Sequence, residues 1–336
     1  MDGWVTNGAG PWEIMGEVKT GQLSELILGP SQSLRIATGG VIPKGGQSVL
    51  PWEEADERAG FLYGRSELGA NMRPAGQESR AGELLISAGT FLNAPKIGLL
   101  AASGHDEIEV AKKPRVAIFF LGDELVHAGV PAGGSVRDAL GPQLPAILEL
   151  YGAEVVIADF VTDDLDLLIN KISVAINSPE SAIDIVITTG GTADGPRDFI
   201  KPAITALGGQ YLIDRVRVRP GYHVLLAEII NLNSRPLAFL ALPGNPQSAV
   251  AALTSFGQPL IASFGGATIA SLAQVHLMEE IKTQAGFARL VPGTLTDNNF
   301  TSTGYLGSHM LRGVAQAAGF ALINPGFVTR WLPIAQ

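Results

Sequence analysis

The feature that most constrains the fold is a strand-like run of apolar residues that ends in two glycines, within residues 184–198. Residues 185–187 are β-branched and apolar, which is typical of a strand covered on both faces. Gly190 and Gly191 then allow the backbone to turn sharply and pass close to a ligand. Because open α/β sheets bind ligands at the carboxyl ends of their strands, the stretch predicts a parallel strand beside a ligand site. A glycine pair also occurs where a strand simply ends, and the pair alone leaves that interpretation open.

The same loop carries side chains that bind ions. Thr188, Thr189 and Thr192 supply hydroxyls, and Asp194 and Asp198 supply carboxylates. All five are expected at one edge of the sheet, so the loop predicts a site for an anion or a nucleotide.

Strands and helices alternate around this loop. Apolar strands are predicted at 115–121, 154–158, 183–189 and 237–242. Helices are predicted between and after them: one ends at Gly152, one is capped by Thr162, one ends at Gly208 and one covers 247–261. This order is typical of a parallel sheet with right-handed crossovers.

The flanking segments have a different pattern. Residues 1–112 contain short apolar runs, such as 33–37 and 83–86, broken by glycine and proline, and a short helix is predicted at 95–103. Residues from about 272 onward return to β-like patterning. The predicted fold class is therefore α/β multidomain, with a central parallel-sheet domain flanked by β-rich domains.

Composition excludes several classes of protein. The formal net charge is −9 and no basic run occurs, which argues against a nucleic-acid partner. The longest apolar stretches are far shorter than the roughly 18 residues of a membrane span, and the first residues do not form a secretory signal. The absence of cysteine excludes disulfides and thiolate metal sites. We therefore expect a cytoplasmic protein without a membrane partner.

Carboxylates follow three of the predicted strands. They are Asp123, Glu124, Asp163, Asp194 and Asp198. Magnesium binds carboxylates together with ligand phosphates, so these residues predict a site for Mg²⁺ or another divalent cation. The alternative is that they are solvated turn and helix-start residues, an interpretation that applies most directly to Asp163.

Two further segments suit an anion. Residues 243–246, Pro-Gly-Asn-Pro, open a helix whose N–H groups could bind an anion together with the Ser248 hydroxyl. Arg215, Arg217 and Arg219 occupy alternate positions of a predicted strand over 211–219, so they should share one face. The alternatives are a rigid turn and a solvated edge strand, respectively. The five histidines are widely spaced, form no zinc-type pair, and are interpreted as structural or exposed.

Eight segments, in order along the chain, resemble motifs of the MoeA-type molybdopterin molybdotransferases, the family that includes the E domain of gephyrin. They are Met1-Asp-Gly-Trp-Val5, Arg35 to Gly45, Asn71 to Glu78, Leu121-Gly-Asp-Glu-Leu125, Thr189 to Asp198, Arg219-Pro-Gly221, Leu242 to Ser248 and Gly307-Ser-His309. The resemblance implies four domains: β-rich 1–78, a remnant of the dimer or linker domain at 79–112, a molybdopterin-binding α/β domain at 113–271, and a small β domain at 272–336.

The resemblance also implies a reaction: insertion of molybdate into adenylylated molybdopterin with release of AMP, aided by Mg²⁺. It places catalytic acids at Asp2, Glu124 and Asp198, and metal ligands at Asp163, Asp198 and Glu124. The substrate-binding positions that it implies are Thr38, Gly190, Gly191, Thr192, Arg215, Arg219, Pro243, Gly244, Asn245, Ser248 and Ser308. It further implies a homodimer with the site between subunits, and contact with a MogA-type adenylyltransferase.

The chain departs from the family pattern at several positions. Asp138-Ala-Leu140 replaces D-[ST]-N, Tyr222 replaces a lysine, and the helical segment that usually precedes the first motif is expected to be missing. Thr189-Gly-Gly-Thr192 is closer to the MogA-type adenylyltransferases. Two alternatives therefore stay open: a non-catalytic pterin-binding or scaffolding paralogue, and a molybdopterin adenylyltransferase.

Overall fold

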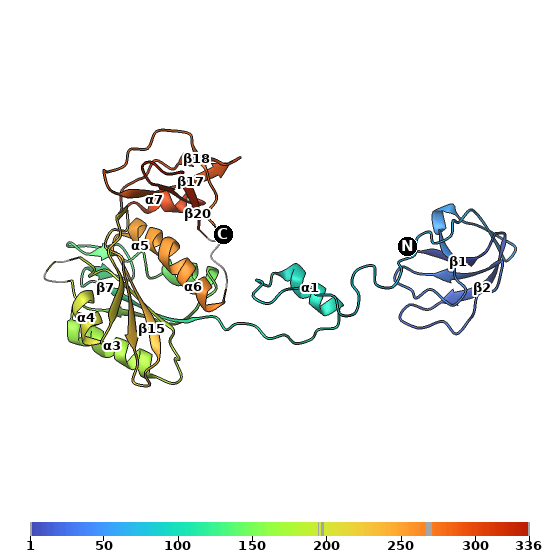
Figure 1. The fold of residues 1–336 in the computed structure, drawn as a ribbon, viewed down its shortest axis with the longest axis horizontal. Coiled ribbons are helices and arrows are strands. Elements are labelled where there is room, and N and C mark those ends of the chain that lie inside the picture. The colour runs from blue at the N-terminus through green and yellow to red at the C-terminus, as the bar shows by residue number, and fades with distance from the viewer. Residues whose placement is uncertain (1, 194, 196–197, 267–270, 335–336) are drawn as a thin grey trace. The chain divides into compact units, whose positions relative to one another are not determined.

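The computed structural model describes residues 2–193, 195, 198–266 and 271–334 (Figure 1). The chain forms two compact units, Met1–Ser87 and Ala88–Gln336. Within the described residues, no helix has both the length and the apolar character to cross a membrane. The four finer domain boundaries stay predictions.

The first unit is a six-stranded sheet with strand order β4-β1-β3-β2-β6-β5. Its core consists of alternate strand residues, among them Val5 and Leu34, and Trp4 packs in a second cluster with Leu50. Residues 83–86 form no strand, and Leu84 is 76% exposed because no neighbouring strand covers it, so that prediction was wrong. The strands are β1 (Gly3–Asn7), β2 (Trp12–Val18), β3 (Gln32–Ile36), β4 (Ser48–Pro51), β5 (Asp56–Arg58) and β6 (Phe61–Tyr63).

A short helix, α1 (Ala94–Ala102), begins the second unit, as the sequence predicts. The Asn93 side chain accepts a hydrogen bond from the Lys96 backbone N–H and so caps the helix. Gly104, at a φ of 84°, lies just beyond its end. No residue of this helix is buried.

The central sheet of the second unit has strand order β10-β7-β11-β15-β14-β12. The first four strands are parallel, and β14 and β12 continue the sheet antiparallel. These bounds confirm the predicted strands at 115–121, 154–158, 183–189 and 237–242 to within a few residues. The strands are β7 (Arg115–Leu121), β10 (Glu154–Val161), β11 (Ile185–Thr189), β12 (Gln210–Asp214), β14 (Leu225–Ile230) and β15 (Pro236–Leu242).

Helices cover both faces of this sheet (Figure 1). Along β7, Ile118 packs with the cluster that contains α2 and α5, whereas Phe119 packs with α3 and α4 on the opposite face. The cap of α3 is Asp164, because its carboxylate accepts the Leu167 N–H, and the prediction of Thr162 was wrong. The helices are α2 (Leu144–Leu150), α3 (Leu165–Asn177), α4 (Ile200–Ala206), α5 (Pro246–Ala252) and α6 (Gln258–Phe264).

The predicted helix over 247–261 contains a π turn, Leu253–Gly257, that joins α5 to α6. Pro259, the second residue of α6, has no N–H to donate into the helix. The π turn accommodates this missing donor while the helix continues.

The C-terminal segment forms another sheet, with order β16-β18-β17-β19-β20 and the two-residue strand β13 (Val218–Arg219) beside β17. Leu290 and Phe320 from this sheet belong to the same apolar cluster as Leu242 of the central sheet. The two sheets therefore share a core. The elements are β16 (His276–Leu277), β17 (Ala288–Thr296), β18 (Asn299–Ser302), α7 (Leu311–Ala315), β19 (Gly319–Ile323) and β20 (Arg330–Pro333).

The three arginines that we expected on one strand do not share a face. β12 ends at Asp214, and Arg215 adopts a left-handed φ of 68°, which turns the chain out of the central sheet. Arg219 lies on β13 and pairs with Arg289 of β17. Arg219 therefore lies beside the C-terminal sheet, whereas Arg215 directly follows a strand of the central sheet.

Burial of the central sheet predicts a large stability effect at Phe239, which is fully buried on β15. Phe239→Ala should lower the free energy of unfolding by about 3–5 kcal/mol because it leaves a cavity. Leu232→Ala, at a position 86% exposed, should change it by less than about 0.5 kcal/mol. Urea unfolding followed by circular dichroism measures both, and equal effects would contradict this account of the core.

Candidate anion-binding site

Three loops meet at the carboxyl edge of the central sheet. The Gly190 N–H donates to the Leu242 carbonyl at 3.0 Å, which joins the loops after β11 and β15. A Cβ on Gly190 would lie 3.2 Å from the Leu121 carbonyl at the end of β7, and one on Gly244 would lie 3.3 Å from Gly190 Cα. Gly190 and Gly191 also have φ of 82° and 62°. Glycine is therefore required where these backbones approach.

The hydroxyls of this loop lie inward. Thr188, Thr189 and Thr192 are all buried, with 4% exposure or less. The Thr188 Oγ1 atom has no hydrogen-bond partner among the described residues. In this conformation the three threonines line the protein interior, and Thr192 as a substrate-binding residue stays a prediction.

Asp198 anchors the Gly-Gly loop. Its Oδ1 accepts the Ala193 N–H at 3.1 Å, and its Oδ2 accepts the Gly195 N–H at 2.6 Å. Charge-assisted bonds of this kind fix the loop backbone. Asp194, the other carboxylate predicted here, lies outside the described residues.

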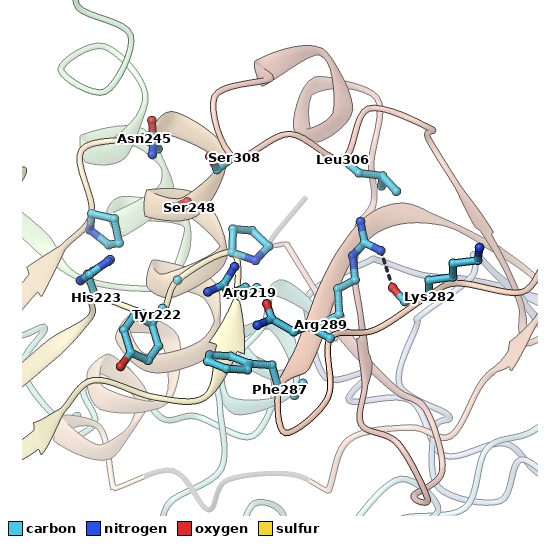
Figure 2. Close-up of a pocket in the computed structure, with 15 residues that line it drawn as sticks. Arg219, Tyr222, His223, Asn245, Ser248, Lys282, Phe287, Arg289, Leu306 and Ser308 are labelled. Atoms are coloured by element: carbon cyan, nitrogen blue, oxygen red, sulfur yellow. Dashed lines mark hydrogen bonds between the residues drawn. The ribbon is translucent and has the colours of Figure 1, made fainter. Parts of the chain in front are cut away.

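A cavity of about 480 Å³ opens between the start of α5 and the C-terminal sheet (Figure 2). The Gln247 N–H donates to the Ser308 carbonyl at 2.9 Å and so fastens the two sides together. Five of the predicted substrate-binding residues line this cavity: Arg219, Pro243, Asn245, Ser248 and Ser308.

The cavity is basic. Arg219, Lys282 and Arg289 line it, and among the described residues no Asp or Glu does. The Arg219 guanidinium lies 4.8 Å from the Phe287 ring centre, and the Arg289 Nη1 donates to the Lys282 carbonyl at 2.5 Å. In a chain of net charge −9, this local cluster of cations can hold an anion.

Sequence reasoning missed Lys282 and Arg289. Neither residue lies in a recognisable motif, and they reach the cavity only because β13 pairs with β17, Arg219 opposite Arg289. A pairing between strands about 70 positions apart leaves no local pattern in the sequence.

The remaining predicted residues of the second unit lie outside the cavity lining. Arg215 is near Asp214, with Nε 3.6 Å from its Oδ1. The Asp163 N–H donates to Asp123 Oδ1 at 3.0 Å, which joins the loops after β10 and β7, and Glu124 is exposed beside them. Gly190, Gly191, Thr192 and Gly244 belong to the loops described for the sheet edge.

The carboxylates do not form a preassembled metal cluster. Within residues 2–193, 195, 198–266 and 271–334, no group of three or more histidine or acidic side chains could hold a metal. Magnesium commonly takes one or two protein carboxylates together with substrate phosphates and water. The acids at these loops suit that mode of binding, in which the substrate supplies the other ligands.

The first unit brings Asp2 and Thr38 together. The Thr38 N–H donates to Asp2 Oδ1 at 2.6 Å. This bond and a second one from the Thr38 side chain hold the pKa of Asp2 below its ordinary value. Asp2 is therefore a carboxylate at neutral pH, at the edge of a turn that Gly39 and Gly40 continue.

Comparison with known proteins agrees with this architecture. Residues 117–263 match the family model of a probable molybdopterin binding domain, and residues 1–104 match that of the MoeA N-terminal region (domain I and II). The parallel α/β domain is thus of the class that the probable molybdopterin binding domain defines. The chain belongs to the MoeA-type family.

Individual relatives give the degree of similarity. The molybdopterin molybdenumtransferase of Nostoc sp. is 34% identical over 257 residues, which is 76% of this chain and 58% of that protein. The Staphylococcus aureus (strain COL) molybdopterin molybdenumtransferase is 28% identical over 85% of this chain and 67% of its own length. The chain thus spans about three fifths to two thirds of these relatives.

Among solved structures, the molybdopterin biosynthesis MoeA protein from Pyrococcus horikoshii has a TM-score of 0.73. The match covers 99% of this chain and 86% of the Pyrococcus chain, at 22% sequence identity. This likeness establishes the multidomain α/β fold.

The bonds of Asp198 predict a local effect of its removal. Asp198→Ala should speed amide hydrogen exchange at Ala193 and Gly195 about tenfold or more, because both N–H groups lose a charged acceptor. The matched variant Asp164→Ala should instead speed exchange at Leu167. Unchanged protection at Ala193 and Gly195 would show that Asp198 does not anchor the loop.

The Asp2 contact predicts a pH dependence. Because the folded pKa of Asp2 is lowered from 3.8, its contribution to stability is complete above that value and is lost as pH falls through the lower folded pKa. A carbon NMR titration of the Asp2 carboxyl should give a midpoint below 3.8. In Thr38→Val the midpoint should rise only part of the way, since the backbone N–H remains. A midpoint at or above 3.8 in the unmodified protein would refute the contact.

Proposed function

We propose that this protein is a molybdopterin molybdotransferase, which inserts molybdate into adenylylated molybdopterin and releases AMP. The observation that carries the proposal is the basic cavity, in which Arg219, Lys282 and Arg289 face the start of α5 and no acid of the described part of the chain is in the lining. Both substrates are anions, and a cavity lined by fixed cations stabilises negative charge without reorganisation. The names of the relatives at 34% and 28% identity support the same activity.

The cavity residues would orient the anion. Arg219 is held against Phe287 and Arg289 against the Lys282 carbonyl, so their guanidinium groups are positioned before a ligand arrives. The Ser248 and Ser308 hydroxyls, on the opposite side, can donate to oxyanion oxygens. These groups bind and position the anion, and they move no proton.

The carboxylates of the neighbouring loops would hold a divalent cation. We propose that one or two of Asp198, Glu124 and Asp163 bind it together with substrate oxygens and water, and that Asp2 is a further catalytic acid. Bound there, Mg²⁺ would neutralise phosphate charge at the bond to be cleaved. Asp198 would then have two roles, because its oxygens keep lone pairs beyond those that accept the loop N–H groups.

We further propose a homodimer that receives its substrate from a MogA-type adenylyltransferase. The segment around α1 supports the dimer, because Phe91 is 82% exposed and Ile97 is 57% exposed. Exposed apolar side chains near one short helix are a candidate contact surface for a partner subunit. Sedimentation equilibrium would give the number of subunits.

The activity predicts a defined product. Purified protein supplied with adenylylated molybdopterin, molybdate and magnesium should release AMP, which chromatography detects. Arg219→Gln should lower the rate about tenfold or more, because one charged donor to the anion is lost. Lys112→Gln, which removes the same charge from an exposed position outside the cavity, should leave the rate unchanged.

The other outcomes identify the alternatives. Tight binding of adenylylated molybdopterin with no AMP release would contradict the enzyme and favour a scaffold. Consumption of ATP with molybdopterin would instead favour an adenylyltransferase. The Thr189-Gly-Gly-Thr192 segment resembles the corresponding motif of the MogA-type adenylyltransferases.

A further inference from the structure

One side chain of the cavity has a nitrogen that the protein does not satisfy. His223 lines the cavity beside Arg219 and Tyr222, and its ring is half-buried. Its Nδ1 atom is buried and has no hydrogen-bond partner among the described residues. The centres of the Tyr222 and His223 rings lie 5.0 Å apart, and the rings are edge to face. His223 lies on the cavity wall (Figure 2), and because Nδ1 is buried while the ring is only half-buried, we infer that the edge that carries Nε2 is the one the cavity exposes.

The burial of Nδ1 selects one tautomer of the neutral ring. A neutral imidazole carries its proton on one nitrogen, and the other nitrogen is an acceptor. A proton on Nδ1 would be a buried donor without an acceptor, an arrangement that folded proteins rarely tolerate. It would also leave the bare Nε2 lone pair facing any anion in the cavity, which is repulsive. Both effects favour the proton on Nε2.

The cavity also contains fixed positive charge. Arg219, Lys282 and Arg289 supply this charge, and no carboxylate lines the cavity within the residues that the structure describes. A neutral Nε2–H adds a directed donor without adding a fourth positive charge to this cluster. The cavity thus combines cations, which attract any anion, with a donor whose direction is fixed by the ring.

We propose that His223 determines the oxyanion specificity of the cavity by donating its Nε2–H to a ligand oxygen, which favours an oxyanion that carries no proton. This inference rests on the proposed function, since it concerns the same cavity. Molybdate in neutral solution has only acceptor oxygens. Hydrogen phosphate has one O–H, which must find an acceptor, and Nε2 in this tautomer is not one. His223 therefore favours molybdate over phosphate.

The tautomer can be measured directly. Long-range proton–nitrogen NMR correlation on the full chain, labelled with nitrogen-15, distinguishes the protonated from the bare ring nitrogen. His223 should show a bare Nδ1 and a protonated Nε2, with and without molybdate. A ring protonated at Nδ1 would overturn the proposal.

Binding of the anions tests the function of this donor. Titration calorimetry with sodium molybdate should show His223→Phe to bind about tenfold or more weakly than the unmodified protein, because a hydrogen bond to a charged ligand is lost. His223→Gln should retain most of the affinity, since the Gln amide reaches about as far as Nε2, whereas His223→Asn should not. With sodium phosphate in mildly alkaline buffer, His223→Phe should change affinity by less than about threefold. The matched control is His276→Phe, an exposed position on β16 that should bind both anions as the unmodified protein does.

The outcomes separate this proposal from the proposed function. If the unmodified protein binds no molybdate, the anion cavity and the proposed function fail together. If it binds molybdate and His223→Phe binds equally well, the specificity role fails alone. Equal losses in His223→Phe and His223→Gln, with lowered thermal stability in both, would show that His223 is only structural.

Discussion

The shared core between the central sheet and the C-terminal sheet determines where the cavity lies. Leu242, at the end of β15, packs in the same cluster as Leu290 and Phe320, so the loop after β15 faces β17. The pairing of β13 with β17 then places Arg219 opposite Arg289. Burial of apolar surface thus holds like charges close together, which electrostatics alone would oppose.

Strand positions and glycine loops could be predicted from the sequence because they follow from local patterns. The strand at 115–121 appears with the bounds that its apolar run predicts, and the loop after β11 contacts the loop after β15 through Gly190 and Gly244. The arginine patch could not be predicted, because alternation along a strand assumes a regular backbone. The left-handed φ of Arg215 interrupts the regular strand backbone, so the alternation of faces ends there.

The basic lining shows a second limit of sequence reasoning. Lys282 and Arg289 reach the cavity through pairing of distant strands, and His223 is distinctive only because its Nδ1 is buried. Burial of one atom depends on the packing of several segments. By contrast, the catalytic and metal-binding role of Asp198 was predicted from its motif and stays a prediction, and the structure shows that Asp198 anchors its own loop.

The π turn at Leu253–Gly257 lies inside the helix after β15 and separates α5 from α6. A π turn contains one residue more than an α turn, which rotates the following residues by about 100°. Residues 247–252 are all buried, whereas Ile261 is the one buried residue of α6. A deletion of one residue here would restore a regular α-helix and turn the Asn245 and Ser248 end of the cavity relative to α6. The number of residues in the helix from Pro246 to Phe264 therefore cannot change by even one without an effect on the cavity. None of residues 253–257 is among those that line the cavity.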